Sequence, residues 1–157
     1  EEKIHRVYVV SNGALAGVLT TRDLVTMVHD TSTHRELEAP LSAHMSAPVL
    51  TVHADRAISL ATEELKHGRV SGLVVVDEHD WPIGVYSQIE ALKHSSSPGD
   101  TPVEKAMSAA VLALPPWVPI HRAAKQAAVT RVRRIIVVDN GDVCGILTGL
   151  DLAALLI

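Results

Sequence analysis

Three acidic residues occupy equivalent positions at which a carboxylate could bind the hydroxyl groups of a ligand. Asp23, Glu90 and Asp151 each follow a Ser or Thr by three positions, and each stands at the expected start of a helix. A carboxylate in that place can accept both hydroxyls of a ribose, and the nearby Ser or Thr hydroxyl can reach a phosphate. The positive end of the helix dipole favours both groups. The alternative is a plain helix cap, which stabilises a helix by about 0.5–1 kcal/mol without any ligand.

A cluster of basic residues precedes the third of these carboxylates. Arg131, Arg133 and Arg134 could supply cations for a phosphate, which a guanidinium fork suits well. Because side chains alternate along a strand, we expect Arg131 and Arg133 on one face and Arg134 on the other. A solvated basic stripe is the alternative interpretation of the same residues.

Motifs typical of enzymes and metal sites are absent from the sequence. It contains no Gly-x-Ser-x-Gly motif, no phosphate-binding glycine-rich loop and no His-Glu-x-x-His helix. The nine histidines are scattered, no pair has the close spacing of a zinc site, and Cys144 is the one cysteine. We therefore expect neither an enzyme nor a metal site.

The composition bears on partners and compartment. A formal net charge of −4 gives no general attraction to nucleic acid or to an anionic membrane. No apolar run approaches the roughly 18 residues that span a membrane. A single cysteine cannot form an internal disulfide, which fits a reducing compartment. We expect a cytoplasmic protein with no nucleic-acid or membrane partner.

Elements that could position the carboxylates recur three times along the chain. Residues 5–24, 71–91 and 133–152 each contain a Val- or Ile-rich strand, a tight turn, a second strand and the start of a helix. Asn12-Gly13 and Asn140-Gly141 predict hairpins with type I′ turns, because both residue types tolerate a positive φ.

The second and third segments also share a front half, which the first one lacks. Residues 45–52 and 107–114 each form a linker that leads into a short strand, and an amphipathic helical segment follows both. The interval from Met45 to Ser71 is 26 positions, as is the interval from Met107 to Arg133. We therefore expect the chain to begin inside a repeat, with further sequence upstream.

These patterns predict an α/β (α+β) fold of tandem βαββα repeats, paired by pseudo-twofold symmetry and preceded by a partial copy. The expected bounds are residues 1–30 for the C-terminal half of a truncated first copy, 40–95 for a complete second copy and 102–157 for a complete third copy.

The repeat resembles the CBS domain, named after cystathionine β-synthase. The resemblance rests on the three aligned segments and on Gly-Ile-Leu-Thr-Gly-Leu-Asp-Leu at residues 145–152. Residues 69–73 and 131–135 look like the nucleotide-lining strands of the gamma subunit of AMP-activated protein kinase. In this family two copies pair through their sheets and bind adenosine ligands in the clefts between them, and the resemblance implies the same here.

The resemblance also assigns site residues. The better site would hold the ribose on Asp151 and the α-phosphate near Thr148, with the full set Met45, Leu50, Val70, Ser71, Arg133, Arg134, Thr148, Leu150 and Asp151. A second and weaker site would use Ser87, Glu90, Met107, Leu112 and Val132. It is expected to be weaker because Glu90 is one methylene longer than the family's Asp, and because Ser71-Gly72 replaces the basic pair. The candidates in the partial copy are His5, Arg6, Thr20, Arg22 and Asp23.

The function expected from this assignment is regulatory. The module would bind AMP, ADP, ATP or a related adenosyl ligand in the cleft between copies, with no cofactor other than this regulatory nucleotide. The alternative is a structural dimerisation module with empty clefts. We expect a homodimer, formed through a smooth alanine face at Ala123, Ala124, Ala127 and Ala128, and a fused or separate effector domain as a further partner.

Overall fold

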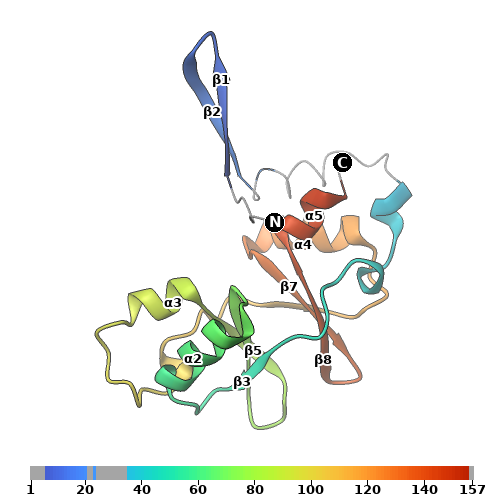
Figure 1. The fold of residues 1–157 in the computed structure, drawn as a ribbon. Coiled ribbons are helices and arrows are strands. Elements are labelled where there is room, and N and C mark those ends of the chain that lie inside the picture. The colour runs from blue at the N-terminus through green and yellow to red at the C-terminus, as the bar shows by residue number, and fades with distance from the viewer. Residues whose placement is uncertain (1–5, 21–22, 24–34, 156–157) are drawn as a thin grey trace.

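The computed structural model describes residues 6–20, 23 and 35–155. The first element is a two-stranded antiparallel hairpin, β1 (Arg6–Ser11) and β2 (Ala14–Thr20), which projects away from the rest of the molecule (Figure 1). The turn residues Asn12 and Gly13 have φ values of 50° and 77°. The pair Asn140 and Gly141 has φ values of 50° and 100°, so both predicted type I′ turns are confirmed.

Two complete copies follow the hairpin, and each has the predicted βαββα order. The second copy contains β3 (Thr51–His53), α2 (Ile58–Gly68), β4 (Gly72–Val76), β5 (Pro82–Ser87) and α3 (Gln88–Lys93). The third contains β6 (Leu112–Leu114), α4 (Ile120–Thr130), β7 (Arg134–Asp139), β8 (Asp142–Thr148) and α5 (Gly149–Ala154). Short 3-10 turns, η1 (Arg35–Glu38), η2 (Leu41–Ala43) and η3 (Val103–Lys105), lie in the linkers. In each sheet the central strand pairs in parallel with the first strand and antiparallel with the third, which confirms the mixed α+β class.

The helices α2 and α4 each end at a left-handed arginine, which their sequences do not predict. Ile58, Ala61 and Leu65 form the buried face of α2, at the spacing of an amphipathic helix. The helix ends at Arg69, which has φ 50° and ψ 34°, and α4 ends at Arg131 with φ 57° and ψ 26°. A left-handed residue at this point commonly terminates a helix, and here an arginine in each copy takes the place that glycine usually holds.

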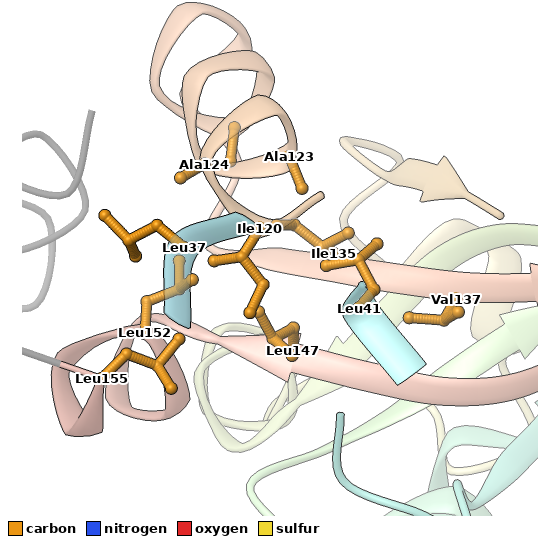
Figure 2. Packing of buried hydrophobic residues seen from close by; sticks show 11 residues of the cluster. Leu37, Leu41, Ile120, Ala123, Ala124, Ile135, Val137, Leu147, Leu152 and Leu155 are labelled. Carbon is orange, nitrogen blue, oxygen red and sulfur yellow. The ribbon is translucent and has the colours of Figure 1, made fainter. Parts of the chain in front are cut away.

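The core of the third copy lies between α4, α5 and one face of the β7–β8 sheet (Figure 2). Three of the four alanines of α4 that we expected to form a dimer contact, Ala123, Ala124 and Ala127, are buried in this core, and Ala128 is half-buried. That expectation is wrong for a simple reason: small side chains let α4 approach its own sheet closely. The equivalent core of the second copy contains Val52, Ile58, Ala61, Leu65, Leu73, Val75 and Tyr86.

A third apolar cluster joins the two complete copies. It contains Val74, Val76 and Val85 of the second copy and Ile136 and Val138 of the third. The odd and even residues of β4 and β7 therefore serve different cores, because side chains alternate across a strand. One face of each sheet meets its own helices, and the other face meets the opposite copy.

The two complete copies also exchange their linkers. Leu37 and Leu41, which precede β3, pack in the core of the third copy, and Val103 and Ala106, which precede β6, pack in the core of the second. The same exchange appears in the backbone. Ser46 exchanges hydrogen bonds of 2.9 and 3.1 Å with Ile146, and Ser108 exchanges hydrogen bonds of 2.9 Å each with Val85. These reciprocal contacts are what a pseudo-twofold axis between the copies requires.

Among the helices of the described chain, none combines the length and the apolar character needed to cross a lipid bilayer.

Candidate functional site

The start of α5 holds the best candidate ligand group. Asp151 accepts hydrogen bonds of 2.6 Å from both the backbone N–H and the hydroxyl of Thr148, and both bonds end on its Oδ2 atom. Thr148 ends β8 and is half-buried, as is Asp151. This is one half of a capping box, in which the acidic residue three positions into the helix accepts from the residue at the helix start.

The same unit recurs in the other two copies. Thr20 donates through its backbone N–H at 2.7 Å and through its hydroxyl at 2.6 Å to Oδ2 of Asp23. Ser87 donates its hydroxyl to Glu90 and accepts at 3.3 Å from the N–H of Ile89. The capping role is therefore present in all three copies. It is compatible with ribose recognition at Asp151, because both hydrogen bonds from Thr148 end on the same carboxylate oxygen.

The carboxylate of Glu90 has more polar and charged neighbours than a helix cap alone requires. Its side chain is 12% exposed and lies 3.6 Å from the ammonium group of Lys93. Burial alone would raise the pKa of Glu90, but the Ser87 hydroxyl, backbone N–H groups and Lys93 together hold the pKa below its ordinary value. The carboxylate is therefore ionised and already well supplied with partners.

Arg134 lies at the junction of the two copies. Its backbone pairs with Thr148 in the β7–β8 ladder, but its guanidinium crosses to the second copy and approaches the Ser71 carbonyl oxygen at 3.5 Å. Burial lowers the pKa of Arg134, an effect that the charge of Glu90 opposes and that of Arg133 reinforces.

The location of the Arg134 side chain differs from the one expected for the basic pair. We expected Arg133 and Arg134 together beside Asp151, and we expected no phosphate cation from Ser71-Gly72 in the weaker site. The side chain of Arg134 extends to Ser71 of the second copy, where the charge of Glu90 acts on it, while Arg133 is exposed. Strand alternation had already separated the two arginines, so that part of the pattern was visible in the sequence.

The predicted base-lining residues are distributed between the copies. Met45 packs against the core of the third copy, and Met107 against the core of the second, so the exchanged linkers bring each methionine to the copy whose carboxylate was assigned to its site. Leu50 and Val70 both lie against Gly68 in the second copy. The Ser71 carbonyl oxygen accepts from the N–H of Gln88 at 3.4 Å, at the start of α3.

The remaining assigned residues are placed as follows. Leu112 and Val132 pack against the core of the third copy, and Leu150 is half-buried on α5. Of the partial-copy candidates, Thr20 and Asp23 form the cap described above, and the backbone of Arg6 pairs with Thr20. His5 and Arg22 lie outside the described residues.

Two surface hollows lie at the opposite ends of the sheets from the helix starts. One, of about 730 Å³, is lined by His53, Asp55, Arg56, Asp77, Glu78 and Glu104, among others. The other, of about 320 Å³, lies between Trp81 and Trp117. Neither is lined by an assigned nucleotide-binding residue. Within residues 6–20, 23 and 35–155, no group of three or more His, Cys, Asp or Glu side chains is arranged to hold a metal ion.

The repeated capping units, the paired sheets and the exchanged linkers point to one family. A family model described as the CBS domain matches residues 1–30, 41–97 and 98–157. The chain belongs to the CBS domain family. It spans 11% and 52% of the length of two curated relatives that it matches.

Solved structures with the same fold include CBS pairs with bound ligands. A conserved, uncharacterized protein of Pyrococcus horikoshii is 22% identical, with a TM-score of 0.76 over 98% of this chain and 69% of that one. The CBS domain pair of protein MJ0100, in complex with 5′-methylthioadenosine and S-adenosyl-L-methionine, is 24% identical, with a TM-score of 0.65 over 75% and 95% of the two chains. CBSX2, in complex with AMP, is 25% identical, with a TM-score of 0.61 over 74% and 94%.

Sequence reasoning missed two features of the site: the linker exchange and the crossing of Arg134. One sequence feature could have indicated the linker exchange: Gly84 and Gly145 stand at equivalent positions of β5 and β8. Met107 and Met45 occupy the space that a Cβ at these glycines would need. The crossing of Arg134 left no such signal, since it depends on how the two sheets pack.

Proposed function

We propose that this chain is a regulatory module that binds an adenosine-containing ligand, such as AMP, ADP, ATP or a related adenosyl compound, between its second and third copies. The observation that carries the proposal is the Thr148–Asp151 unit. Its carboxylate is fixed in orientation by two hydrogen bonds to one oxygen and sits at the positive end of α5. Support also comes from the adenosine ligands bound to the CBS pairs of MJ0100 and CBSX2.

In this proposal Asp151 recognises the ribose and Thr148 lies near the phosphate. Arg133 is the exposed cation nearest in sequence to this cleft, whereas Arg134 belongs to the cleft of Glu90. The Glu90 carboxylate is expected to bind ribose less well, because Ser87 and Lys93 already satisfy it. The chain catalyses no reaction, acts in the cytoplasm and transmits ligand binding to an effector domain.

The second candidate function is a structural module with empty clefts. The observation that favours it is that the capping role alone explains the conformations of Asp151, Glu90 and Asp23. Each carboxylate satisfies a helix start, which is a sufficient reason for its presence. The two functions make opposite predictions for ligand affinity.

Calorimetric titration of AMP and ATP into variants at the two helix starts separates the candidates. Asp151→Ala should weaken nucleotide affinity at least about tenfold, because it removes two charge-assisted hydrogen bonds of roughly 1.5–3 kcal/mol each and one decade corresponds to about 1.4 kcal/mol. Asp151→Asn should weaken binding similarly while keeping an acceptor for Thr148. Glu90→Ala is the matched control and should affect affinity much less.

The outcomes are distinct. If Asp151→Ala loses only about 1 kcal/mol of folding stability and binds as tightly as the wild type, the ribose assignment is wrong and the residue is a cap. If the wild type binds neither nucleotide, and a thermal-shift screen with S-adenosylmethionine and NAD also shows no stabilisation, the structural module is favoured.

A homodimer is part of the proposal, although the contact first expected for it is buried. Apolar residues that remain exposed on the helices are Leu60 of α2, Ile89 and Leu92 of α3 and Val129 of α4. Such residues are what a contact between helices of two protomers would cover. Light scattering should show a dimer at high micromolar concentration, and a monomer under those conditions would contradict this part of the proposal.

A further inference from the structure

Trp81 and Trp117 are large aromatic side chains that the fold leaves at the surface. They are 48% and 68% exposed, and both line the same hollow of about 320 Å³. Trp81 belongs to the second copy and Trp117 to the third, so the hollow lies across both copies. Trp is strongly enriched among the residues that contribute most to binding at protein interfaces. An exposed pair around one hollow therefore points to an interaction site.

The other residues that line this hollow are mostly apolar. They include Ala113, Leu114 and Val138. Ala113 and Val138 also belong to the apolar cluster that joins the two complete copies, so the hollow opens at the edge of that junction. A hollow of this volume has room for an apolar side chain of a partner.

The turn that carries Trp81 is fixed by its own hydrogen bonds. The Asp77 carboxylate accepts at 2.9 Å from the N–H groups of both His79 and Trp81, and these bonds hold the pKa of Asp77 below its ordinary value. The Asp77 N–H donates at 3.0 Å to the Trp81 carbonyl oxygen, and the Asp80 N–H donates at 3.1 Å to the Asp77 carbonyl oxygen. Trp81 is therefore presented from a well-held backbone.

The loop that carries Trp117 is anchored by one of the exchanged linkers. The carbonyl oxygens of Pro116 and Val118, its two neighbours, accept from the N–H groups of Ser42 at 3.0 Å and Leu41 at 2.9 Å. A pre-organised binding surface loses less entropy on association than a mobile one. The backbone at both tryptophans is thus in place before a partner binds.

The rim around the two indoles is acidic. Asp80 directly precedes one tryptophan, and Asp139 and Asp142 flank the β7–β8 turn residues that line the hollow. Residues 77–81 and 139–142 together contain five carboxylates and no Lys or Arg. Such a rim attracts a positively charged partner and repels an acidic one.

The ion pairs at this rim involve histidines. Asp80 lies 3.8 Å from His53, and Glu78 lies 3.8 Å from His79. A histidine compensates a carboxylate only when it is protonated, so these pairs leave room for a permanent cation. Arg suits the site best, because its guanidinium group pairs with carboxylates and also stacks on indole rings. The net charge of −4 disfavours a second copy of this chain as the occupant.

We propose that the hollow between Trp81 and Trp117 is the docking site for a basic segment of a partner protein, in which an apolar side chain lies beside arginines. The apolar side chain would enter the hollow, and the arginines would meet the carboxylates of Glu78, Asp80 and Asp142. The site does not depend on the proposed nucleotide binding, because none of the assigned nucleotide-binding residues lines the hollow.

Intrinsic fluorescence tests this proposal directly, because the sequence has two tryptophans and both line the hollow. The probe is the acetylated peptide Arg-Leu-Arg-Leu-Arg, which should shift the tryptophan emission saturably. The peptide Arg-Ser-Arg-Ser-Arg has the same charge but no apolar side chain, and it should bind at least about tenfold more weakly. The peptide Glu-Leu-Glu-Leu-Glu should cause no saturable shift. Added salt should weaken binding of the first peptide, because the rim is exposed.

Variants of the hollow separate its aromatic walls from its acidic rim. Trp117→Ala should weaken binding of the Arg–Leu peptide at least about tenfold, and Trp117→Phe should lose less because it keeps an aromatic ring. Glu78→Gln combined with Asp80→Asn should weaken binding at least about threefold, since it removes two exposed charge pairs. Because Trp117 is exposed, both of its variants should melt within about 3 °C of the wild type, which excludes unfolding as the cause.

Two substitutions elsewhere on the surface serve as matched controls. Leu92→Ala removes an exposed apolar side chain of α3, and Glu63→Gln removes an exposed carboxylate of α2. Both should leave the affinity for the Arg–Leu peptide unchanged, because neither residue lines the hollow.

Three outcomes would overturn the proposal. The first is the absence of a saturable shift with the Arg–Leu peptide. The second is equal affinity for the Arg–Ser peptide, which would reduce the effect to diffuse charge attraction. The third is an emission shift that depends on protein concentration without peptide and is abolished by Trp117→Ala, which would identify a second copy of this chain as the occupant. Failure of nucleotide binding has no bearing on any of these results.

Discussion

The hairpins β7–β8 and β1–β2 have the same register, the same bulge and the same Asn-Gly turn, yet one is buried and the other is exposed. Ile136 of β7 is completely buried, whereas its equivalent Tyr8 is 66% exposed. The difference is not in the strands themselves. It arises because β7 has β6, α4 and the second copy around it, and β1 has no such neighbours among the described residues.

This comparison separates what forms locally from what requires a partner. A type I′ turn between β-branched residues is enough to specify a hairpin and its register. The free energy of burial depends on elements that are distant in sequence. The local sequence therefore specifies the hairpin, whereas burial of its strands in the CBS fold requires the pairing of two copies.

The largest effect should come from truncation at the junction of the two complete copies. Ile136→Ala removes a fully buried side chain from the cluster that joins them and should lower the free energy of unfolding by about 2–5 kcal/mol. Tyr8→Ala, at the equivalent exposed position, should change it by no more than about 0.5 kcal/mol in residues 1–157. Urea unfolding of the two variants measures the difference.

Equal losses for the two variants would break the comparison, since they would show that Tyr8 is buried in solution. Ile136→Val, with an expected loss of about 0.5–1.5 kcal/mol, provides a milder variant should the alanine variant fail to fold.

A smaller loss of stability is expected from a substitution at the helix start that follows the buried hairpin β4–β5. The Thr20–Asp23 unit is exposed, whereas Ser87 is buried and the Glu90 carboxylate is held by Ser87, Lys93 and backbone N–H groups. Glu90→Gln should lower the stability at pH 7 by about 0.5 kcal/mol, since it removes a charge from the helix N-terminus.

The pH dependence gives the sign of this effect. The pKa of Glu90 in the folded chain lies below its ordinary value of 4.5, so the ionised carboxylate stabilises the fold above that pH. This stabilisation is lost as the pH falls through the folded-state pKa. The gap between wild type and Glu90→Gln in urea unfolding should therefore narrow as the pH falls below 4.5, and a gap that stays constant would show that the charge contributes nothing.

Much of the fold could be predicted from the sequence because its signals are local. The Asn-Gly turns, the apolar spacing of Ile58, Ala61 and Leu65 and the equal repeat intervals specify the hairpins, the helices and the βαββα order. The Ser/Thr–acid pairs of the candidate site were likewise visible, and the structure gives them the geometry of helix caps.

Some sequence patterns allowed two tertiary roles, and the tertiary structure decided between them. The alanine stripe of α4 suited a dimer contact or close packing on its own sheet, and the structure uses it for the latter. Arg134 could face either cleft, and it crosses to Ser71. Apolar periodicity predicts that one face of a helix will be buried, but it does not identify the element that packs against it.

By itself, the sequence of this CBS protein determined the elements, their order and the carboxylate at each helix start, since turn chemistry and side-chain periodicity act within a few residues of the chain. Only the tertiary structure decided that the linkers exchange between copies, that the Arg134 side chain crosses to Ser71 and that Val7 to Val10 are exposed among the described residues. The physical reason is that these features depend on packing between segments of different copies, where burial and charge neutralisation select among partners that the local sequence treats as equivalent.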